Sequence, residues 1–272
     1  MLGDYHTHTT LCRHAVGTTA EYVSRAAELG LAEMGFSDHA PFPRPLDDWR
    51  MTWEEFPVYL ERVEEARRIG RELGIAVRLG LECDYITGRE SDLDAVEALT
   101  DFDYLIGSIH YLRPDWVIDA PDAVGRLSAA GLAGVWQEYW TLYARMVDSG
   151  RFDVMGHPDL PKKFGFRPEG DLRHYYLATI AAARRRGIAL EINTSGLRKP
   201  IGEAYPEPAF LELAQEAGLD LVISSDAHAP EDVGAGFPEA IDLARRAGFT
   251  HTTLFEKRRR RSIPLPAAGT WL

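Results

Sequence analysis

A repeating pattern of apolar and polar positions organises the chain. Six times, an amphipathic segment rich in charged residues ends at a glycine, and a short apolar run follows at once. The six glycines are Gly30, Gly74, Gly150, Gly187, Gly218 and Gly248. Glycine after a helix adopts the left-handed backbone conformation at low cost, and a continuous apolar run is typical of a strand covered on both faces. Each unit therefore predicts a helix that leads into a buried parallel strand.

Two further apolar runs bring the predicted strands to about eight. One surrounds residues 2–5, and the other covers residues 103–108. Strands that alternate with helices favour the α/β class and a barrel-like parallel sheet. The last predicted strand, near residues 251–255, is expected to pack outside the ring. Because no linker rich in Gly, Ser or Pro divides the chain, residues 1–272 are predicted to form a single domain.

Signals around the predicted elements indicate where an active site would lie. Thr18 and Glu21 have the spacing of a capping box, which predicts a helix start. Long segments without periodicity, at about 40–57, 111–131 and 158–170, follow strands rather than precede them. In a barrel, loops after strands build the C-terminal face, which is where active sites occur.

Side chains that bind metals gather at the predicted ends of these strands. Seven of the nine histidines lie in seven short islands. The islands are Asp4–His8 with His14, Ser37–His39, Gly80–Glu82, Gly107–His110, Met155–Asp159, Glu191–Asn193 and Ser224–His228. Residues i and i+2 of a strand point to the same side, so His6 with His8 and Asp226 with His228 each form a pair of ligands. Packing accounts for a lone histidine such as His174 but not for this concentration.

The types of ligand indicate the chemistry. Imidazoles and carboxylates without thiolates suit Zn²⁺, Mn²⁺ or Fe²⁺ in open hydrolytic sites rather than in closed structural zinc sites. Nine such side chains are enough for two or three divalent ions if a carboxylate bridges them. Adjacent ions lower the pKa of a shared water and hold the attacking and leaving oxygens of a displacement at phosphorus. The islands therefore predict phosphoester hydrolysis.

The islands resemble the motifs of the polymerase-and-histidinol-phosphatase (PHP) superfamily, from Asp4 to about Lys257. In order they read DYHTHTTLCRHA, FSDHAP, GLECDY, IGSIHYL, GHPDLPKKFG, EINTSGLRK and SSDAH. Within the superfamily they are similar to PHP-type histidinol-phosphate phosphatases. The resemblance implies a distorted (β/α)7 TIM-like barrel, the PHP fold. It also implies a metal-dependent phosphomonoesterase of histidine biosynthesis that hydrolyses L-histidinol phosphate, with a metal-bridging hydroxide attacking phosphorus.

Carried over by position, the resemblance also implies three metal ions and a division of the ligands among them. The first two groups share Glu82 as a bridging carboxylate, and the third group is separate: His6, His8, Glu82 and Asp226; Glu82, His110 and His157; and His14, His39 and His228. No ligand position departs from the family pattern. Glu82, Asp226 and His228, together with Arg198, are expected to take part in catalysis.

Cationic residues close to the islands are candidates for binding the substrate phosphate. Arg198 follows the sixth island and is the leading candidate, because a guanidinium matches phosphate oxygens with two hydrogen bonds. The alternative is a solvated surface arginine. Lys162 and Lys163 are weaker candidates for the same role.

Other residues beside the islands keep alternative roles. Glu191 is expected either to orient a ligand histidine or to be purely structural. Asp38 and Asp159 are candidates for protonating the leaving alkoxide, but local turn hydrogen bonds explain them equally well. The general acid is therefore left unassigned. Cys12 is expected to line the site without ligating, and Cys83 to be a small buried hydrophobic residue.

Charge and composition narrow the alternatives. The 272 residues include 30 Lys+Arg and 42 Asp+Glu, and the net charge of −12 disfavours a nucleic-acid partner. The basic run at 257–261 is interpreted as a solvated segment. The two cysteines, and the lack of a signal-like or membrane-spanning apolar stretch, predict a cytoplasmic protein with no membrane partner. A small phosphate monoester is the expected partner, and homo-oligomer formation is left open.

Two other functions remain as alternatives to the leading prediction. One is a PHP-type phosphoesterase that acts on nucleotides or nucleic-acid ends, which fits the ligands but not the acidic charge. The other is a non-catalytic, metal-stabilised scaffold. The complete ligand set argues against a scaffold, because open sites serve catalysis.

Overall fold

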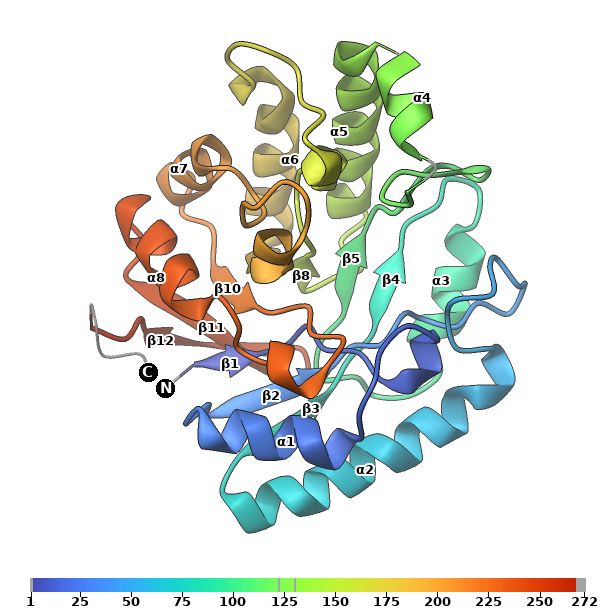
Figure 1. Cartoon of the computed structure of the whole chain (residues 1–272), viewed down its shortest axis with the longest axis vertical. Coiled ribbons are helices and arrows are strands. Elements are labelled where there is room, and N and C mark those ends of the chain that lie inside the picture. Colours follow the sequence, from blue (N-terminus) through green and yellow to red (C-terminus); the bar gives the residue numbers. More distant parts are fainter. Residues whose placement is uncertain (1, 122, 130, 268–272) are drawn as a thin grey trace.

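Parallel strands and helices alternate along the chain, as the glycine-terminated units predict (Figure 1). The computed structural model describes residues 2–121, 123–129 and 131–267. The strands at its centre are β1 (Gly3–Asp4), β2 (Glu33–Phe36), β3 (Ala76–Leu79), β4 (Glu82–Asp84), β5 (Ile106–Ser108), β8 (Val154–Met155), β9 (Ala189–Asn193) and β10 (Leu221–Ser224). The helices around them are α1 (Thr19–Glu28), α2 (Phe56–Leu73), α3 (Glu90–Glu97), α5 (Leu132–Asp148), α6 (Arg173–Arg186), α7 (Pro208–Glu216) and α8 (Phe237–Arg246). No helix within the described ranges is both long enough and apolar enough to span a bilayer.

Two isolated bridges close the strands into a barrel. Strands β1, β2 and β3 form one parallel sheet, and β4, β5, β8, β9 and β10 form another. Thr7 pairs with Ala227 just beyond β1 and β10, and His39 pairs with Glu82 where β4 begins after β2. With β3 and β4 counted as one bent strand, the described residues contain a ring of seven parallel strands. The predicted distorted (β/α)7 TIM-like barrel is confirmed.

The helix boundaries follow the local signals of the sequence. All six glycines that end the predicted helices have positive φ, between +67° and +96°. Thr18 caps α1: its hydroxyl accepts a hydrogen bond from the Glu21 amide, and its own amide donates to the Glu21 carboxylate. Local chemistry therefore determines both ends of these helices.

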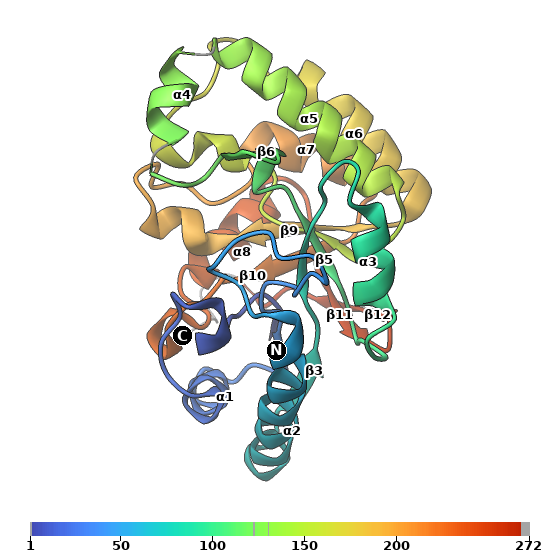
Figure 2. The same cartoon turned by 90° about the vertical axis from the view of Figure 1, so that its right-hand side faces the viewer.

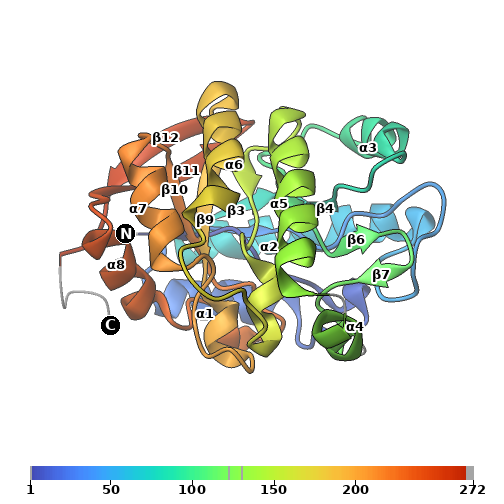
Figure 3. The same ribbon diagram turned by 90° about the horizontal axis from the view of Figure 1, so that it is seen from above.

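The last two strands lie outside the ring, as predicted for residues 251–255. Strands β11 (His251–Glu256) and β12 (Arg259–Pro264) form an antiparallel hairpin beside β10 (Figure 3). The amide of Phe255 donates to the Tyr5 hydroxyl at 2.9 Å. Leu254 and Phe255 pack with Tyr5 and Tyr104 in a small apolar cluster at the amino end of the barrel. The hairpin closes the end of the barrel opposite the loops.

Parts of the segment at 111–131 form regular elements that the sequence did not predict. It contains an antiparallel pair, β6 (Tyr111–Arg113) and β7 (Trp116–Val117), followed by α4 (Ala123–Ala129) on the side of α5 (Figure 2). Strands of two or three residues are too short for an alternating pattern to reveal them. The remaining short elements are the 3-10 helices η1 (Thr10–Cys12), η2 (Trp53–Glu55), η3 (Leu160–Phe164), η4 (Thr194–Arg198) and η5 (Pro230–Asp232).

Gly35 leaves room for a buried tyrosine inside the barrel. The Tyr104 hydroxyl donates to the Tyr5 carbonyl at 2.6 Å, and a Cβ on Gly35 would lie 2.2 Å from that hydroxyl. Gly35→Ala is therefore expected to lower the free energy of unfolding by about 1–3 kcal/mol, because overpacking a dense interior forces side chains to shift. Urea denaturation measures the change.

The matched control for this prediction is Gly134→Ala. Gly134 lies within α5, and a Cβ there meets nothing within 4 Å. The control is expected to leave stability unchanged or to raise it by about 0.5–1 kcal/mol. Equal urea midpoints for the two variants would contradict the packing argument.

Candidate active site

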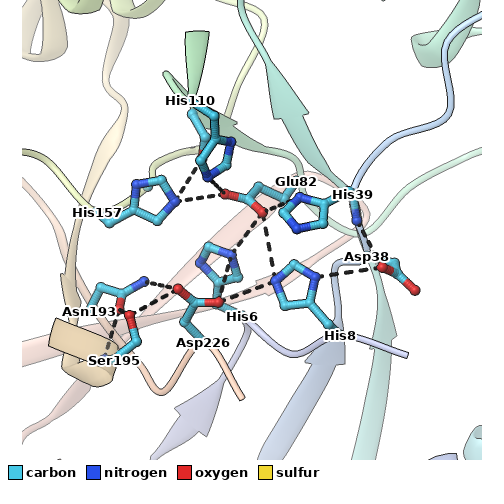
Figure 4. A network of polar contacts seen from close by, with 12 residues as sticks. His6, His8, Asp38, His39, Glu82, His110, His157, Asn193, Ser195 and Asp226 are labelled. Carbon is cyan, nitrogen blue, oxygen red and sulfur yellow. Dashed lines mark hydrogen bonds and ion pairs between the residues drawn. The ribbon is translucent and has the colours of Figure 1, made fainter. Parts of the chain in front are cut away.

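The nine predicted ligand side chains converge at the carboxyl end of the ring. Figure 4 shows His6, His8, His39, Glu82, His110, His157 and Asp226 among them. They come from the chain after β1, β2, β5, β8 and β10 and from the first residue of β4. His6 and His8 are fully buried at the base of the cluster, whereas His14 is exposed at its rim. Closure of the barrel thus assembles the site, because the ligands come from segments far apart in the chain.

One oxygen of Glu82 faces three imidazoles. Its Oε2 lies 2.8 Å from His39 Nδ1, 3.4 Å from His6 Nε2 and 3.7 Å from His8 Nε2. Asp226 lies against the same group, with Oδ1 at 3.3 Å from His8 Nε2 and 3.7 Å from His6 Nε2. The structure brings together the four residues expected around the first ion.

The other oxygen of Glu82 faces a second pair of imidazoles. Its Oε1 lies 2.7 Å from His157 Nε2 and 3.5 Å from His110 Nε2. The Glu82 side chain is 1 % exposed and lies between the two histidine groups (Figure 4). A carboxylate that directs each oxygen to a different group has the geometry of a bridging ligand.

The third group lies at the rim. The rings of His14 and His228 stack with centroids 4.7 Å apart, and His39 lies 5.5 Å from His14. Cys12 also belongs to this region, since its thiol lies within 4.8 Å of ligand atoms of His14 and His228. Burial raises the pKa of the Cys12 thiol to about 12, which disfavours the thiolate form.

The donor atoms of these groups fit divalent cations. His6 Nε2, His8 Nε2 and His39 Nδ1 are buried and make no hydrogen bond with any residue that the structure describes, although carboxylate oxygens lie nearby. Buried polar atoms without partners are costly and uncommon in native proteins. Imidazole nitrogens and carboxylate oxygens that face one another without hydrogen bonding are the expected arrangement of ligands around a cation.

The electrostatics of the cluster keep its carboxylates charged. Burial alone would raise the pKa of Glu82, but the imidazoles of His6 and His110 hold it well below its usual range. The pKa of Asp226 is likewise held well below its usual range against burial, with His6 as the main opposing charge. Burial lowers the pKa of His39 to about 4, so its ring is neutral and able to donate a lone pair.

Two buried carboxylates hold the ligand imidazoles from behind. Glu191 Oε1 lies 2.8 Å from His6 Nδ1, and its Oε2 accepts a hydrogen bond from the His157 amide at 2.6 Å. Asp38 Oδ1 lies 3.5 Å from His8 Nδ1. Such contacts fix which ring nitrogen faces the metal and how the ring is turned.

Sequence analysis missed a third carboxylate of this kind, Asp84. Its Oδ1 lies 2.9 Å from His110 Nδ1, and its Oδ2 accepts a hydrogen bond from the buried guanidinium of Arg50 at 2.9 Å. Asp84 is two residues from Glu82 on β4, so the i, i+2 rule offered a signal. Nothing in the sequence pointed to Arg50, which lies in a long loop.

The geometry gives no support to Asp38 or Asp159 as the general acid. Asp38 is buried and accepts hydrogen bonds from the amide and hydroxyl of Thr9. Asp159 is buried, accepts a hydrogen bond from the Glu207 amide at 2.8 Å and lies 3.1 Å from Lys162 Nζ. Neither residue lines the cavity described next.

A cavity of about 240 Å³ opens over the cluster. Seven of the predicted ligands line it, together with Asp119, Leu160, Lys163, Ser195, Lys199 and Tyr205. A larger cavity of about 550 Å³ lies beside the β11–β12 hairpin, at the amino end of the barrel and away from the histidines. The smaller cavity is therefore the candidate substrate site.

Comparison with known proteins places the chain in a family. A family model described as PHP domain matches residues 4–195. The chain belongs to the PHP domain family. The predicted resemblance is thereby confirmed at the level of the family.

Two relatives and one solved structure extend this finding along most of the chain. The chain is 41% identical over 250 residues to a probable histidinol-phosphatase of Deinococcus radiodurans. The aligned region covers 91% of the chain and 94% of the relative. The chain is 30% identical over 260 residues to the histidinol-phosphatase of Bacillus subtilis, covering 86% of the chain and 96% of that relative.

The solved structure is the histidinol phosphate phosphatase of Lactococcus lactis in complex with zinc, L-histidinol and phosphate. Its TM-score is 0.81 at 21% identity, and the match covers 96% of this chain and 98% of that one. At this identity the likeness establishes the PHP fold.

Within this PHP barrel, the structure places the Arg198 guanidinium against the backbone around Asp226. Its Nη2 donates to the carbonyls of Ser225 at 2.8 Å and Asp226 at 3.3 Å, and its Nε lies 3.2 Å from Asp232 Oδ1. Arg198 is not among the residues that line the cavity. The guanidinium holds the backbone around Asp226, a contact that requires the folded chain and that the sequence could not indicate.

The structure places the two candidate lysines, Lys162 and Lys163, in different surroundings. Lys162 is fully buried, and its Nζ donates to the Ala204 carbonyl at 2.9 Å, so the structure does not bring it to the cavity. Lys163 does line the cavity, and its Nζ lies 3.0 Å from Asp119 Oδ2. Lys199 is a further cation of the lining, which the sequence analysis did not select.

Proposed function

We propose that this protein is a metal-dependent phosphomonoesterase that hydrolyses L-histidinol phosphate to L-histidinol and inorganic phosphate, in histidine biosynthesis. The observation that carries the proposal is a complete set of nine ligand side chains, centred on Glu82, at the carboxyl end of a PHP barrel. The relatives from Deinococcus and Bacillus bear the histidinol-phosphatase name, and the Lactococcus structure holds zinc, L-histidinol and phosphate.

The proposal includes two or three divalent ions, which are zinc, iron or manganese. The residues that would hold them are His6, His8, His14, His39, Glu82, His110, His157, Asp226 and His228. When bound, such ions acidify water and neutralise charge on the phosphoryl oxygens. The unpaired buried nitrogens and the ionised carboxylates of the cluster support this assignment.

The chain's own residues position the reacting groups. Glu191 and Asp84 fix the orientations of His6 and His110 through contacts of 2.8 and 2.9 Å, and Asp38 lies 3.5 Å from His8 Nδ1. The Ser195 hydroxyl lies 2.7 Å from Asn193 Oδ1 and 3.0 Å from Asp226 Oδ2, and its single proton is directed to these two acceptors. The carboxylate beside this hydroxyl, Asp226, is a weak base because its pKa is held well below its usual range by the neighbouring His6 against burial. We therefore favour direct attack of water on phosphorus over a phosphoserine intermediate.

The cations of the lining attract the substrate phosphate. Lys163 and Lys199 bring positive charge into a cavity that also holds the ligand carboxylates. Ammonium groups bind phosphate oxygens as point charges. We therefore assign phosphate attraction to these lysines and a positioning role to Arg198, whose guanidinium is held by backbone carbonyls.

Release of inorganic phosphate by metal-quantified protein tests the proposed function. L-Histidinol phosphate is compared with ribose 5-phosphate, a nucleoside monophosphate and a short oligonucleotide. We expect a large kcat/KM preference for L-histidinol phosphate that chelation removes. Hydrolysis of the nucleotide and oligonucleotide alone would show that the enzyme acts on another class of phosphoester. A metal-loaded protein that is inactive on every compound would favour a non-catalytic scaffold.

Arg198→Ala is expected to lower kcat by about 10- to 100-fold with little change in KM, as for residues that hold metal ligands in place. The reason is that its guanidinium binds the carbonyls of Ser225 and Asp226 rather than facing the cavity. Steady-state kinetics separate the two constants. A rise in KM at constant kcat would instead return Arg198 to the role of phosphate ligand.

A further inference from the structure

Asp119 is a carboxylate of the cavity that the metal cluster does not use. Among the described residues that line the cavity, the carboxylates are Glu82, Asp226 and Asp119. Glu82 and Asp226 each lie within 4 Å of ligand imidazoles, whereas Asp119 makes no such contact. Asp119 thus provides a negative charge in the substrate site that metal binding does not account for.

The backbone holds Asp119 at a fixed position beside the second histidine group. The amide of the preceding residue, Ile118, donates to the His110 carbonyl at 2.7 Å. Lys163 Nζ donates to the Asp119 carbonyl at 2.7 Å and to its Oδ2 at 3.0 Å. These contacts tie the loop after β7 to the segment that contains His110 and to η3.

The Asp119 carboxylate remains available to a ligand. Its side chain is 23 % exposed, and that of Lys163 is 18 % exposed, so the ion pair borders the open cavity. In the described part of the chain, the hydrogen bond to its carboxylate goes to Oδ2, and Oδ1 receives none. Although burial would raise the pKa of Asp119, the charges of His110 and Lys163 lower it, so the group is ionised.

We propose that Asp119 binds the protonated amine of the substrate and selects phosphate monoesters of 2-amino alcohols. In L-histidinol phosphate the amine lies two carbons from the ester oxygen, so an ammonium accompanies the phosphate into the site. A cavity of about 240 Å³ holds both groups, with the phosphate toward the histidines and the amine toward Asp119. This inference rests on the proposed phosphomonoesterase activity and identifies the residue that recognises the amine of its substrate.

Asp119→Asn tests the proposal with matched substrates. We expect kcat/KM for L-histidinol phosphate to fall about 10- to 100-fold, as for loss of a hydrogen bond between charged groups. For the analogue that lacks only the amine, 3-(imidazol-4-yl)propyl phosphate, we expect less than about a 3-fold change, because the bond removed is absent there. Equal losses on the two compounds, or no loss on either, would overturn the assignment.

A second pair of substrates separates this inference from the proposed function. We expect Asp119→Asn to lower kcat/KM for 2-aminoethyl phosphate but not for ethyl phosphate, whichever natural substrate the enzyme prefers. If the wild-type protein hydrolyses phosphate monoesters without preferring L-histidinol phosphate, the proposed function fails while this pair still tests Asp119. An amine-independent loss on this pair would overturn the role of Asp119 alone.

Two further variants control for structural effects. Asp115→Asn removes an exposed carboxylate from the turn between β6 and β7, outside the cavity lining, and should change neither pair of substrates. Asp119→Glu keeps the charge, so it should restore part of the preference for the amine. Melting temperature and metal content are measured for every variant. Loss of the preference in Asp119→Glu and Asp115→Asn alike would show a general effect of the loop and overturn the proposal.

Discussion

Glu82→Gln should abolish phosphate release, with kcat lowered by about 1000-fold or more, because metal ions contribute several kcal/mol to such reactions. The two oxygens of Glu82 face separate histidine groups, at 2.8 Å from His39 and 2.7 Å from His157. The substitution keeps the size of the side chain but removes its charge from both groups. Steady-state kinetics and elemental analysis of the purified variant measure activity and bound metal together.

The control for this prediction is Glu61→Gln, which removes an exposed carboxylate on α2. Its activity and metal content should equal those of the wild-type protein. Asp226→Asn provides an intermediate case, because Asp226 contacts His6 and His8 but not the pair formed by His110 and His157. We expect it to lose less metal than Glu82→Gln. Full activity of Glu82→Gln at unchanged metal content would refute the bridging role.

Removal of the metal ions should eliminate activity and also lower the melting temperature by about 5–10 °C, since ligands that bind only the folded state stabilise it by mass action. Within the described part of the chain, His6 Nε2, His8 Nε2 and His39 Nδ1 make no hydrogen bond that would replace the lost coordination. Differential scanning calorimetry before and after chelation measures the shift. Addition of Mn²⁺, Zn²⁺ or Fe²⁺ should restore both stability and turnover.

Glu82→Gln again supplies the comparison for metal removal. Because this variant should already lack part of its metal, chelation should shift its melting temperature less than that of the wild-type protein. A chelator that lowers the melting temperature equally in both proteins would show that the stabilising ion lies elsewhere. Activity that survives complete removal of metal would contradict the proposed mechanism.

The regular elements were predictable because their signals are local. Gly74 and Gly187 each follow an amphipathic helix and precede an apolar run, and both adopt the left-handed conformation that ends a helix. The short hairpin of β6 and β7 was missed because its strands have two or three residues. Local signals specify an element only when it is long enough to repeat its pattern.

The sequence by itself predicted which side chains gather as candidate ligands, because strand ends and i, i+2 spacing place histidines such as His6 and His8 on one side of a strand. Only the tertiary structure decided what the loop residues contact. It directs Arg198 to backbone carbonyls and brings Asp119 to the cavity. A strand fixes side-chain direction through local geometry, whereas the direction of a loop side chain depends on partners distant in the chain, and only the folded barrel brings those partners together.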